Sequence, residues 1–155
     1  MTTALYATIW FALALLAIAV IVDARVKPSP PWARVAYAAG AALAVVHTLI
    51  ALGTTYGWDH ERAVAETARQ AGDVYGFSWR GSIYVSYAFL IVWAIDAWRQ
   101  QAITRRWVVR AFFLVIIINA AIVFASPAGR VLGVLVVAAL LWAWRPRLIT
   151  QKLPQ

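Results

Sequence analysis

The sequence predicts an all-α, polytopic integral membrane protein with five transmembrane helices. Of its 155 residues, 64% are hydrophobic and only 13% are charged, whereas a soluble domain is about half apolar and about a quarter charged. A soluble chain of this length could not bury so much apolar surface, because small domains keep much of their surface in water. Five apolar stretches approach the roughly 20 residues that a helix needs to cross a bilayer. These predicted spans cover residues of about 4–22, 35–53, 82–98, 107–125 and 128–144.

The first stretch could be confused with a signal peptide, and the last stretch is short for a membrane span. No charge interrupts Ala4 to Val22, no basic residue precedes this stretch, and basic residues follow it. A secretory signal peptide has the opposite charge order and a shorter apolar core. We therefore expect an uncleaved first helix with its N-terminus outside. The last stretch is shorter, but Ser126 and Pro127 favour a helix start there, since serine caps helices and proline is tolerated in a first turn.

The loop charges predict an N-out, C-in orientation. One side of the predicted bundle carries Arg25, Lys27, Arg34, Arg99, Arg105, Arg106, Arg110, Arg145, Arg147 and Lys152. The long loop on the other side carries Asp59, Glu61, Glu66 and Asp73 against Arg62, Arg69 and Arg80. Positively charged loops stay in the cytoplasm. The same placement explains the net charge of +8 without nucleic-acid binding. Arginine exceeds lysine, and alanine and valine abound, so we expect a GC-rich bacterial source and an inner-membrane location.

Tryptophan and tyrosine residues form two bands, as expected for residues that prefer the membrane–water interfaces. The predicted cytoplasmic band consists of Trp32, Trp98, Trp107, Trp142 and Trp144. The predicted outer band consists of Tyr6, Trp10, Tyr56, Trp58, Trp79 and Tyr84. Trp93 is expected deep in the bundle.

Small residues recur at four-residue spacing in two of the spans. They are Ala36, Gly40, Ala44 and Thr48 in the second span, and Ala125, Gly129 and Gly133 at the fifth. Small side chains let membrane helices approach closely. We favour packing within this chain, and docking onto another subunit is the alternative.

Asp96, Arg110 and Asn119 are polar residues inside the predicted spans. Asp96 and Arg110 face each other across a short connection, and a charge at that depth is costly unless it pairs or reaches the interface. We therefore expect an Asp96–Arg110 ion pair with Arg99 as competitor, and a proton-relay carboxylate is the alternative. Asn119 is expected to hydrogen-bond within the bundle, with ligand contact as the alternative.

His47 is the candidate cofactor-binding residue. An ionisable side chain inside a membrane span indicates a functional site by default, and an imidazole can ligate haem b or hydrogen-bond a quinone. A hydrogen-bonded packing role is the alternative. His60 is thirteen residues further on, which is about 20 Å along a continuous helix. One haem therefore cannot be held by both, and a second ligand would have to come from a partner. Ser82 and Ser86 are expected near the depth of His47.

The connection over residues 54–81 is the only sizeable piece expected outside the membrane. Residues Asp59 to Gln70 predict a short helix with a weak apolar face of Ala63, Val64, Ala65 and Ala68, and with Arg62–Glu66 and Glu66–Arg69 pairs. The aromatic and histidine side chains of this connection are candidates for docking a partner: Trp58, His60, Tyr75, Phe77 and Trp79. Packing of the connection against its own bundle is the alternative.

The motifs leave three classes of function. There is no cysteine, which excludes disulfides and thiolate chemistry, and no phosphate loop, zinc-protease motif or nucleophile elbow occurs. No catalytic or metal-binding residue is therefore assigned. The favoured hypothesis is a non-catalytic anchor or accessory subunit, with the lipid bilayer and other protein subunits as partners. The alternative is a redox subunit that binds quinone or haem b at His47 and serves a periplasmic oxidoreductase. A small transporter or membrane enzyme is the third hypothesis.

Overall fold

The computed structural model describes residues 3–99 and 107–145, and these residues form helices and short connections without any strand. The prediction of an all-α fold is confirmed for this part of the chain. In chain order the elements are α1 (Thr3–Arg25), α2 (Pro31–Thr54), α3 (His60–Tyr75), α4 (Ser82–Trp98), α5 (Trp107–Ile118), η1 (Asn119–Val123) and α6 (Pro127–Trp144). Arg105, Arg106, Arg147 and Lys152, which contribute to the predicted orientation, lie outside the described residues.

Three of the helices, α1, α2 and α6, are long and apolar enough to cross a membrane. Two shorter apolar helices, α4 and the α5–η1 run over Trp107–Val123, accompany them. Large apolar side chains also cover much of the outer surface, including Phe11, Val35, Ile91, Val131 and Leu135. A soluble monomer rarely exposes apolar area on this scale. These features indicate a membrane protein.

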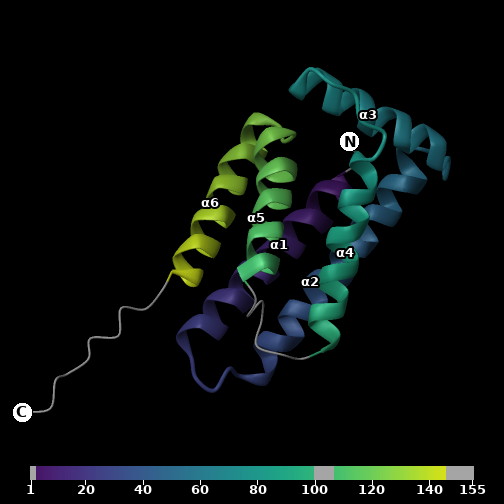
Figure 1. Ribbon diagram of the computed structural model, residues 1–155. Helices are drawn as coiled ribbons and strands as arrows, with labels where there is room; N and C mark the ends of the chain where they lie inside the picture. Colours follow the sequence, from purple (N-terminus) through teal and green to yellow (C-terminus); the bar gives the residue numbers. More distant parts are fainter. Residues whose placement is uncertain (1–2, 100–106, 146–155) are drawn as a thin grey trace, which may run out of the picture.

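The apolar helices run side by side, and α1 lies between the α5–α6 pair and the α2–α4 pair (Figure 1). Helix α1 packs most extensively on α2 and also contacts α6, while α4 contacts α2 and α5. Their shared core contains five large, fully buried side chains: Trp93, Phe113, Leu16, Ile117 and Leu140. The burial of Trp93 agrees with its expected depth.

Several helices extend beyond the predicted spans. Helix α1 continues past Val22 to Arg25, and α2 begins at Pro31 rather than at Val35. Apolar residues mark where lipid surrounds a helix, whereas the backbone hydrogen bonds can continue into the interface. Pro31 suits the start of α2 because proline is tolerated in a first turn. At α6, the Ser126 hydroxyl accepts a hydrogen bond from the Gly129 N–H at 3.3 Å, as the sequence predicted.

The predicted helix over residues 107–125 changes geometry within its last third. The α-helix ends at Ile118, and Asn119–Val123 form a π-helical turn in which the Phe124 N–H donates to the Asn119 carbonyl at 3.0 Å. A π-helical turn shifts the backbone pairing by one residue, and such turns occur frequently at functional sites. This turn lies against α6.

Helix α3 lies across one end of the bundle (Figure 1). It begins after Asp59, whose carboxylate accepts from the Arg62 N–H at 3.0 Å, and it ends at Gly76 in the left-handed conformation. The helix thus runs five residues beyond the predicted end at Gln70. Its buried face consists of Ala63, Val64, Ala68 and Ala71. Ala65 is exposed, so its predicted place on the apolar face was wrong, because it lies on the opposite side of the helix. A small second core joins α3 to α2 and α4 through Ile83, Leu52, Tyr56 and Tyr87.

Candidate functional site

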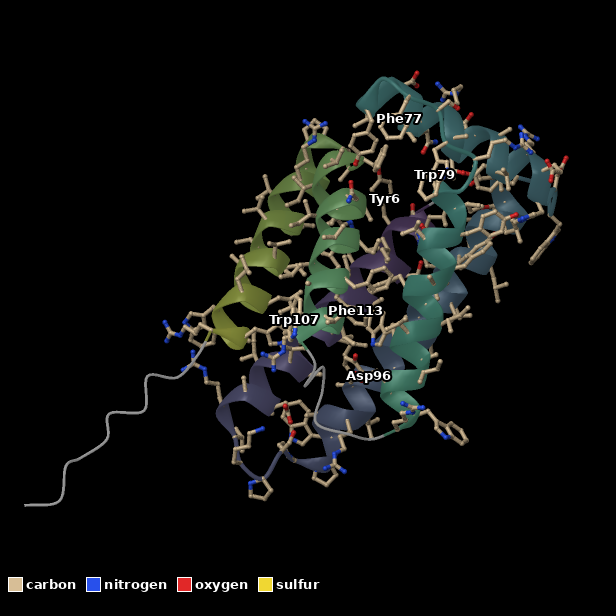
Figure 2. The ribbon with its side chains drawn as sticks, in the orientation of Figure 1. Tyr6, Phe77, Trp79, Asp96, Trp107 and Phe113 are labelled. Atoms are coloured by element: carbon tan, nitrogen blue, oxygen red, sulfur yellow. The ribbon has the colours of Figure 1, made fainter. Side chains whose placement is uncertain are left out.

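A cavity of about 290 Å³ lies in the half of the bundle that α3 covers. Its wall is mainly apolar and includes residues from α1, α2, α4, α5, η1 and α6. Five residues of the wall are exposed, so the cavity opens to the surface: Tyr6, Ser86, Ala120, Phe124 and Ser126. Tyr6 lies beneath the connection that carries Phe77 and Trp79 (Figure 2).

His47 lines this cavity and links α2 to α1. Its Nδ1 lies 3.0 Å from the Leu5 carbonyl oxygen and 3.3 Å from the Thr8 hydroxyl. A carbonyl oxygen can only accept a hydrogen bond, so Nδ1 carries the proton of the neutral ring. The other ring nitrogen, Nε2, then keeps a lone pair that can accept a hydrogen bond from a ligand. His47 therefore combines the packing role with a place in a cavity wall.

Four hydroxyl side chains share the cavity wall with His47: Tyr6, Thr48, Ser86 and Ser126. Thr48 is satisfied within its own helix, because its hydroxyl donates to the Ala44 carbonyl at 3.1 Å. Ser86 lies on α4 and is exposed in the cavity wall. The sequence predicted that Ser86 would lie near the depth of His47, and the structure brings both residues to one cavity. The cavity wall thus offers a ligand a hydrogen-bond acceptor, His47 Nε2 on α2, and a hydroxyl, that of Ser86 on α4.

A second polar contact lies near the opposite end of the bundle. The Tyr37 hydroxyl donates to the Asp96 carboxylate at 2.8 Å and so joins α2 to α4. The Arg110 guanidinium lies 5.6 Å from the centre of the Trp144 ring. The Asp96–Arg110 ion pair stays a prediction. Tyr37 was not among the predicted site residues. It lies six residues into α2, and Asp96 lies two residues before the end of α4, which places the two at a common depth.

Asn119 connects the bundle to the end of α3. Its side-chain oxygen accepts from the Tyr75 hydroxyl, and its side-chain nitrogen donates to the Val115 carbonyl at 2.8 Å. The Tyr75 ring also packs edge-on against Phe124, with ring centres 5.9 Å apart. Because Phe124 belongs to the cavity wall, the end of α3 is tied to the rim of the cavity.

The predicted docking residues form two exposed groups at the two ends of α3. Trp58 and His60 lie at its start, Tyr75 is its last residue, and Phe77 and Trp79 follow its end. His60 packs against Tyr84 and Tyr87, with ring centres 5.9 and 6.0 Å away. His60 is not part of the wall of the His47 cavity. The structure therefore does not bring the two histidines to one site.

The small residues of both predicted files lie against helices of this same chain. A Cβ added at Gly40 would lie 3.0 Å from the Ala12 carbonyl oxygen and from the Trp93 ring. Ala44 is buried in the shared core, and Ala36 packs against it. Gly129 and Gly133 are both buried, and a Cβ at Gly133 would overlap the Ala121 backbone. These residues let α1 approach α2 and η1 approach α6.

Charged residues of α3 form ion pairs with one another and with Arg80, which lies in the connection after α3. Arg69 binds Glu66 at 2.7 Å and Asp73 at 2.6 Å, and Arg80 binds Glu61 at 2.5 Å. The hydrogen bonds from Arg69 and then Gln70 lower the pKa of Glu66 to about 2. Glu66 thus pairs with Arg69, as predicted, while the Arg62 N–H contributes to the helix cap.

Comparison of the chain with models of protein families, with curated proteins and with solved structures finds no match. Its function must be argued from its own residues. Within residues 3–99 and 107–145, no group of three or more histidine, cysteine, aspartate or glutamate side chains could hold a metal ion.

Proposed function

We propose that this chain is a five-span membrane subunit with its N-terminus outside and its C-terminus in the cytoplasm of a bacterial inner membrane. Helix α4 and the α5–η1 run have 17 residues each by their bounds, which corresponds to about 25 Å at the helical rise. That length is slightly below the roughly 30 Å of a hydrocarbon core, and local thinning of the bilayer accommodates such a mismatch. Both elements lie beside the three longer helices.

The described charges support this orientation. The end of the bundle opposite α3 carries Arg25, Lys27, Arg34, Arg99, Arg110 and Arg145, with only Asp23 and Asp96 as acidic residues. The end with α3 carries Arg62, Arg69, Arg80 and Arg130, balanced by Asp59, Glu61, Glu66 and Asp73. An excess of basic residues marks the cytoplasmic side.

The function that the cavity supports best is binding of a lipid-soluble quinone or quinol by a subunit of a redox complex. The observation that carries this proposal is His47 in the cavity wall, with Nδ1 fixed on the Leu5 carbonyl and Nε2 left as an acceptor. A quinol hydroxyl can donate to Nε2, and the Ser86 hydroxyl can donate to a quinone carbonyl. Ser86 on α4 and Ala120 on η1 are both exposed in the wall, and in a membrane such a ligand would enter beside them from the lipid.

The cavity size favours a single-ring ligand over haem. One benzene ring occupies an apolar protein cavity of about 150 Å³, and the volume here is about 290 Å³. A substituted quinone ring fits this space, whereas the porphyrin of a haem, with four linked pyrrole rings, exceeds it. His60 also lies away from the cavity wall, so this chain's described residues offer no second histidine ligand there.

Titration of the purified chain in lipid nanodiscs with a short-chain quinol tests the proposal. We expect His47→Leu and Ser86→Ala each to weaken binding by about tenfold, since a hydrogen bond contributes roughly 1–1.5 kcal/mol. His60→Leu is the matched control, because His60 lies outside the cavity, and its affinity should equal that of the unmodified chain. Equal binding by His47→Leu, Ser86→Ala and the unmodified chain would rule the quinone site out.

A second candidate is an anchor or accessory subunit that binds no ligand and holds a periplasmic partner. The exposed aromatic group of Tyr75, Phe77 and Trp79 favours this role, since aromatic residues are enriched in protein interfaces. Purification from native membranes in mild detergent tests it. A partner that is retained by the unmodified chain and lost from Phe77→Ser with Trp79→Ser supports docking there. A lone, monodisperse chain contradicts it.

A further inference from the structure

Two arginines meet one tryptophan ring at the end of the bundle opposite the cavity. The Arg25 guanidinium carbon, at the end of α1, lies 3.5 Å from the centre of the Trp142 ring, and that of Arg145, just after α6, lies 5.4 Å from it. Among residues 3–99 and 107–145, neither guanidinium forms an ion pair. The nearby carboxylate in sequence, Asp23, pairs with Lys27 at 3.5 Å.

This arrangement leaves the hydrogen-bond donors of both arginines available. A guanidinium that lies over an aromatic ring uses its flat face for the contact, and its N–H groups point outward in its own plane. Guanidinium groups bind phosphate oxygens through paired N–H donors of this kind. Two positive charges gathered around one ring also repel each other, and an anion between them would relieve that repulsion.

We infer that Arg25, Trp142 and Arg145 bind the phosphate group of an anionic phospholipid. The surface around them is amphipathic, because Trp142 is 44% exposed and the adjoining Leu141 is 53% exposed at the same end of α6. A phosphate can contact the two arginines while an acyl chain lies along the apolar side of α6. Basic sites between helices on the cytoplasmic side bind acidic lipid headgroups in this way.

This inference rests on the placement of the chain in a membrane and not on the quinone proposal. The cluster and the cavity lie at opposite ends of the bundle and share no residue. Loss of lipid binding with normal quinol binding, or the reverse, would therefore separate the two proposals.

Native mass spectrometry of the full chain in detergent, titrated with phosphatidylglycerol or with phosphatidylcholine of the same acyl chains, tests the site. We expect preferential binding of phosphatidylglycerol. The double variant R25Q/R145Q should weaken that binding about 10- to 30-fold, because each arginine near a membrane surface contributes roughly 1 kcal/mol. The control R34Q/R99Q removes the same charge at the same end but away from Trp142, and it should retain at least most of the affinity.

Two further measurements complete the test. Trp142→Leu should also weaken binding, and Trp142→Phe should restore part of it, because phenylalanine still offers an aromatic face to the arginines. Inorganic phosphate, added as competitor, distinguishes a lipid headgroup from a free anion. Equal loss in R25Q/R145Q and in R34Q/R99Q, no preference between the two lipids, or full displacement by submillimolar phosphate would overturn the inference. Circular dichroism and gel filtration would verify that each variant is folded.

Discussion

Gly133 is the residue at which the closest approach between two helices can be tested. Gly133 packs against Ala121 in the π-helical turn. A Cβ added at Gly133 would overlap the Ala121 carbonyl group. Backbone atoms cannot move aside as a flexible side chain can. We expect Gly133→Ala to lower the free energy of unfolding by about 1–3 kcal/mol, the usual cost of overpacking, measured by denaturant titration in detergent micelles.

Gly72→Ala is the control for this prediction. A Cβ at Gly72 would lie 3.5 Å from the nearest atom, on Ser78, which is an ordinary contact. Alanine in a helix is favoured over glycine by roughly 0.5–1 kcal/mol, so this variant should be as stable as the original chain or more stable. If both variants behaved alike, the close contact between η1 and α6 would not exist.

Single residues could be selected from the sequence by their chemical type, but their partners could not. His47 and Asp96 were selected because an ionisable residue in an apolar span is unusual. The partner of His47 is the Leu5 carbonyl, and every residue has a carbonyl, so no sequence pattern indicates it. Tyr37 resembled an ordinary interfacial tyrosine until the structure placed its hydroxyl on Asp96. The cavity forms only where six elements meet, and no pattern in a single sequence indicates how distant elements pack.

At the scale of the elements, α3 owes part of its local stability to its surface ion pairs. Hydrogen bonds from Arg69 and Gln70 lower the pKa of Glu66 from 4.5 to about 2 in the folded chain. A lowered pKa means that the contribution of Glu66 is fully present above its unfolded value near 4.5 and is lost as the pH falls toward 2. We expect a carboxyl NMR titration in micelles to place the Glu66 midpoint near 2 and to show faster amide exchange in α3 across that interval.

Two variants distinguish the hydrogen bonds to Glu66 from a general effect of acid on the protein. Arg69→Gln should return the midpoint of Glu66 toward its ordinary value, because it removes the largest cause of the shift. Arg130→Gln removes a charge from the same end of the molecule without touching Glu66, so its titration should match that of the unmodified chain. An ordinary midpoint in the unmodified chain would contradict the hydrogen-bonded geometry.

The existence of each element followed from the sequence more readily than its limits. The pair Ser126 and Pro127 marked the start of α6 because capping is a local interaction. The end of α3 was placed too early, since its last turns carry Ala71 on the buried face and depend on packing against the bundle. The π-helical turn from Asn119 to Val123 had no recognised signal in a stretch that is apolar apart from Arg110 and Asn119. Local interactions are therefore visible in the sequence, and contacts between distant elements are not.

The whole molecule has two chemically different ends. One end has α3, a balanced set of charges and the His47 cavity, and the other has an excess of arginine around exposed tryptophan. Phe77 and Trp79 lie at the first end, and Asp96 and Trp107 lie toward the second (Figure 2). The proposed ligand would therefore bind in the outer half of the membrane, and the proposed lipid phosphate would bind at the cytoplasmic surface.

The absence of native cysteine allows this arrangement to be tested by single-cysteine labelling in intact cells. Ala65→Cys on exposed α3 should react with a membrane-impermeant thiol reagent from outside. Val26→Cys, which is 48% exposed between α1 and α2, should react only after permeabilisation. We expect this result because an excess of basic residues, as around Val26, favours a cytoplasmic location for a connection. Phe113→Cys is the buried control and should react in neither case. Labelling of Val26→Cys in intact cells with protection of Ala65→Cys would reverse the orientation and place the cavity in the inner half of the membrane.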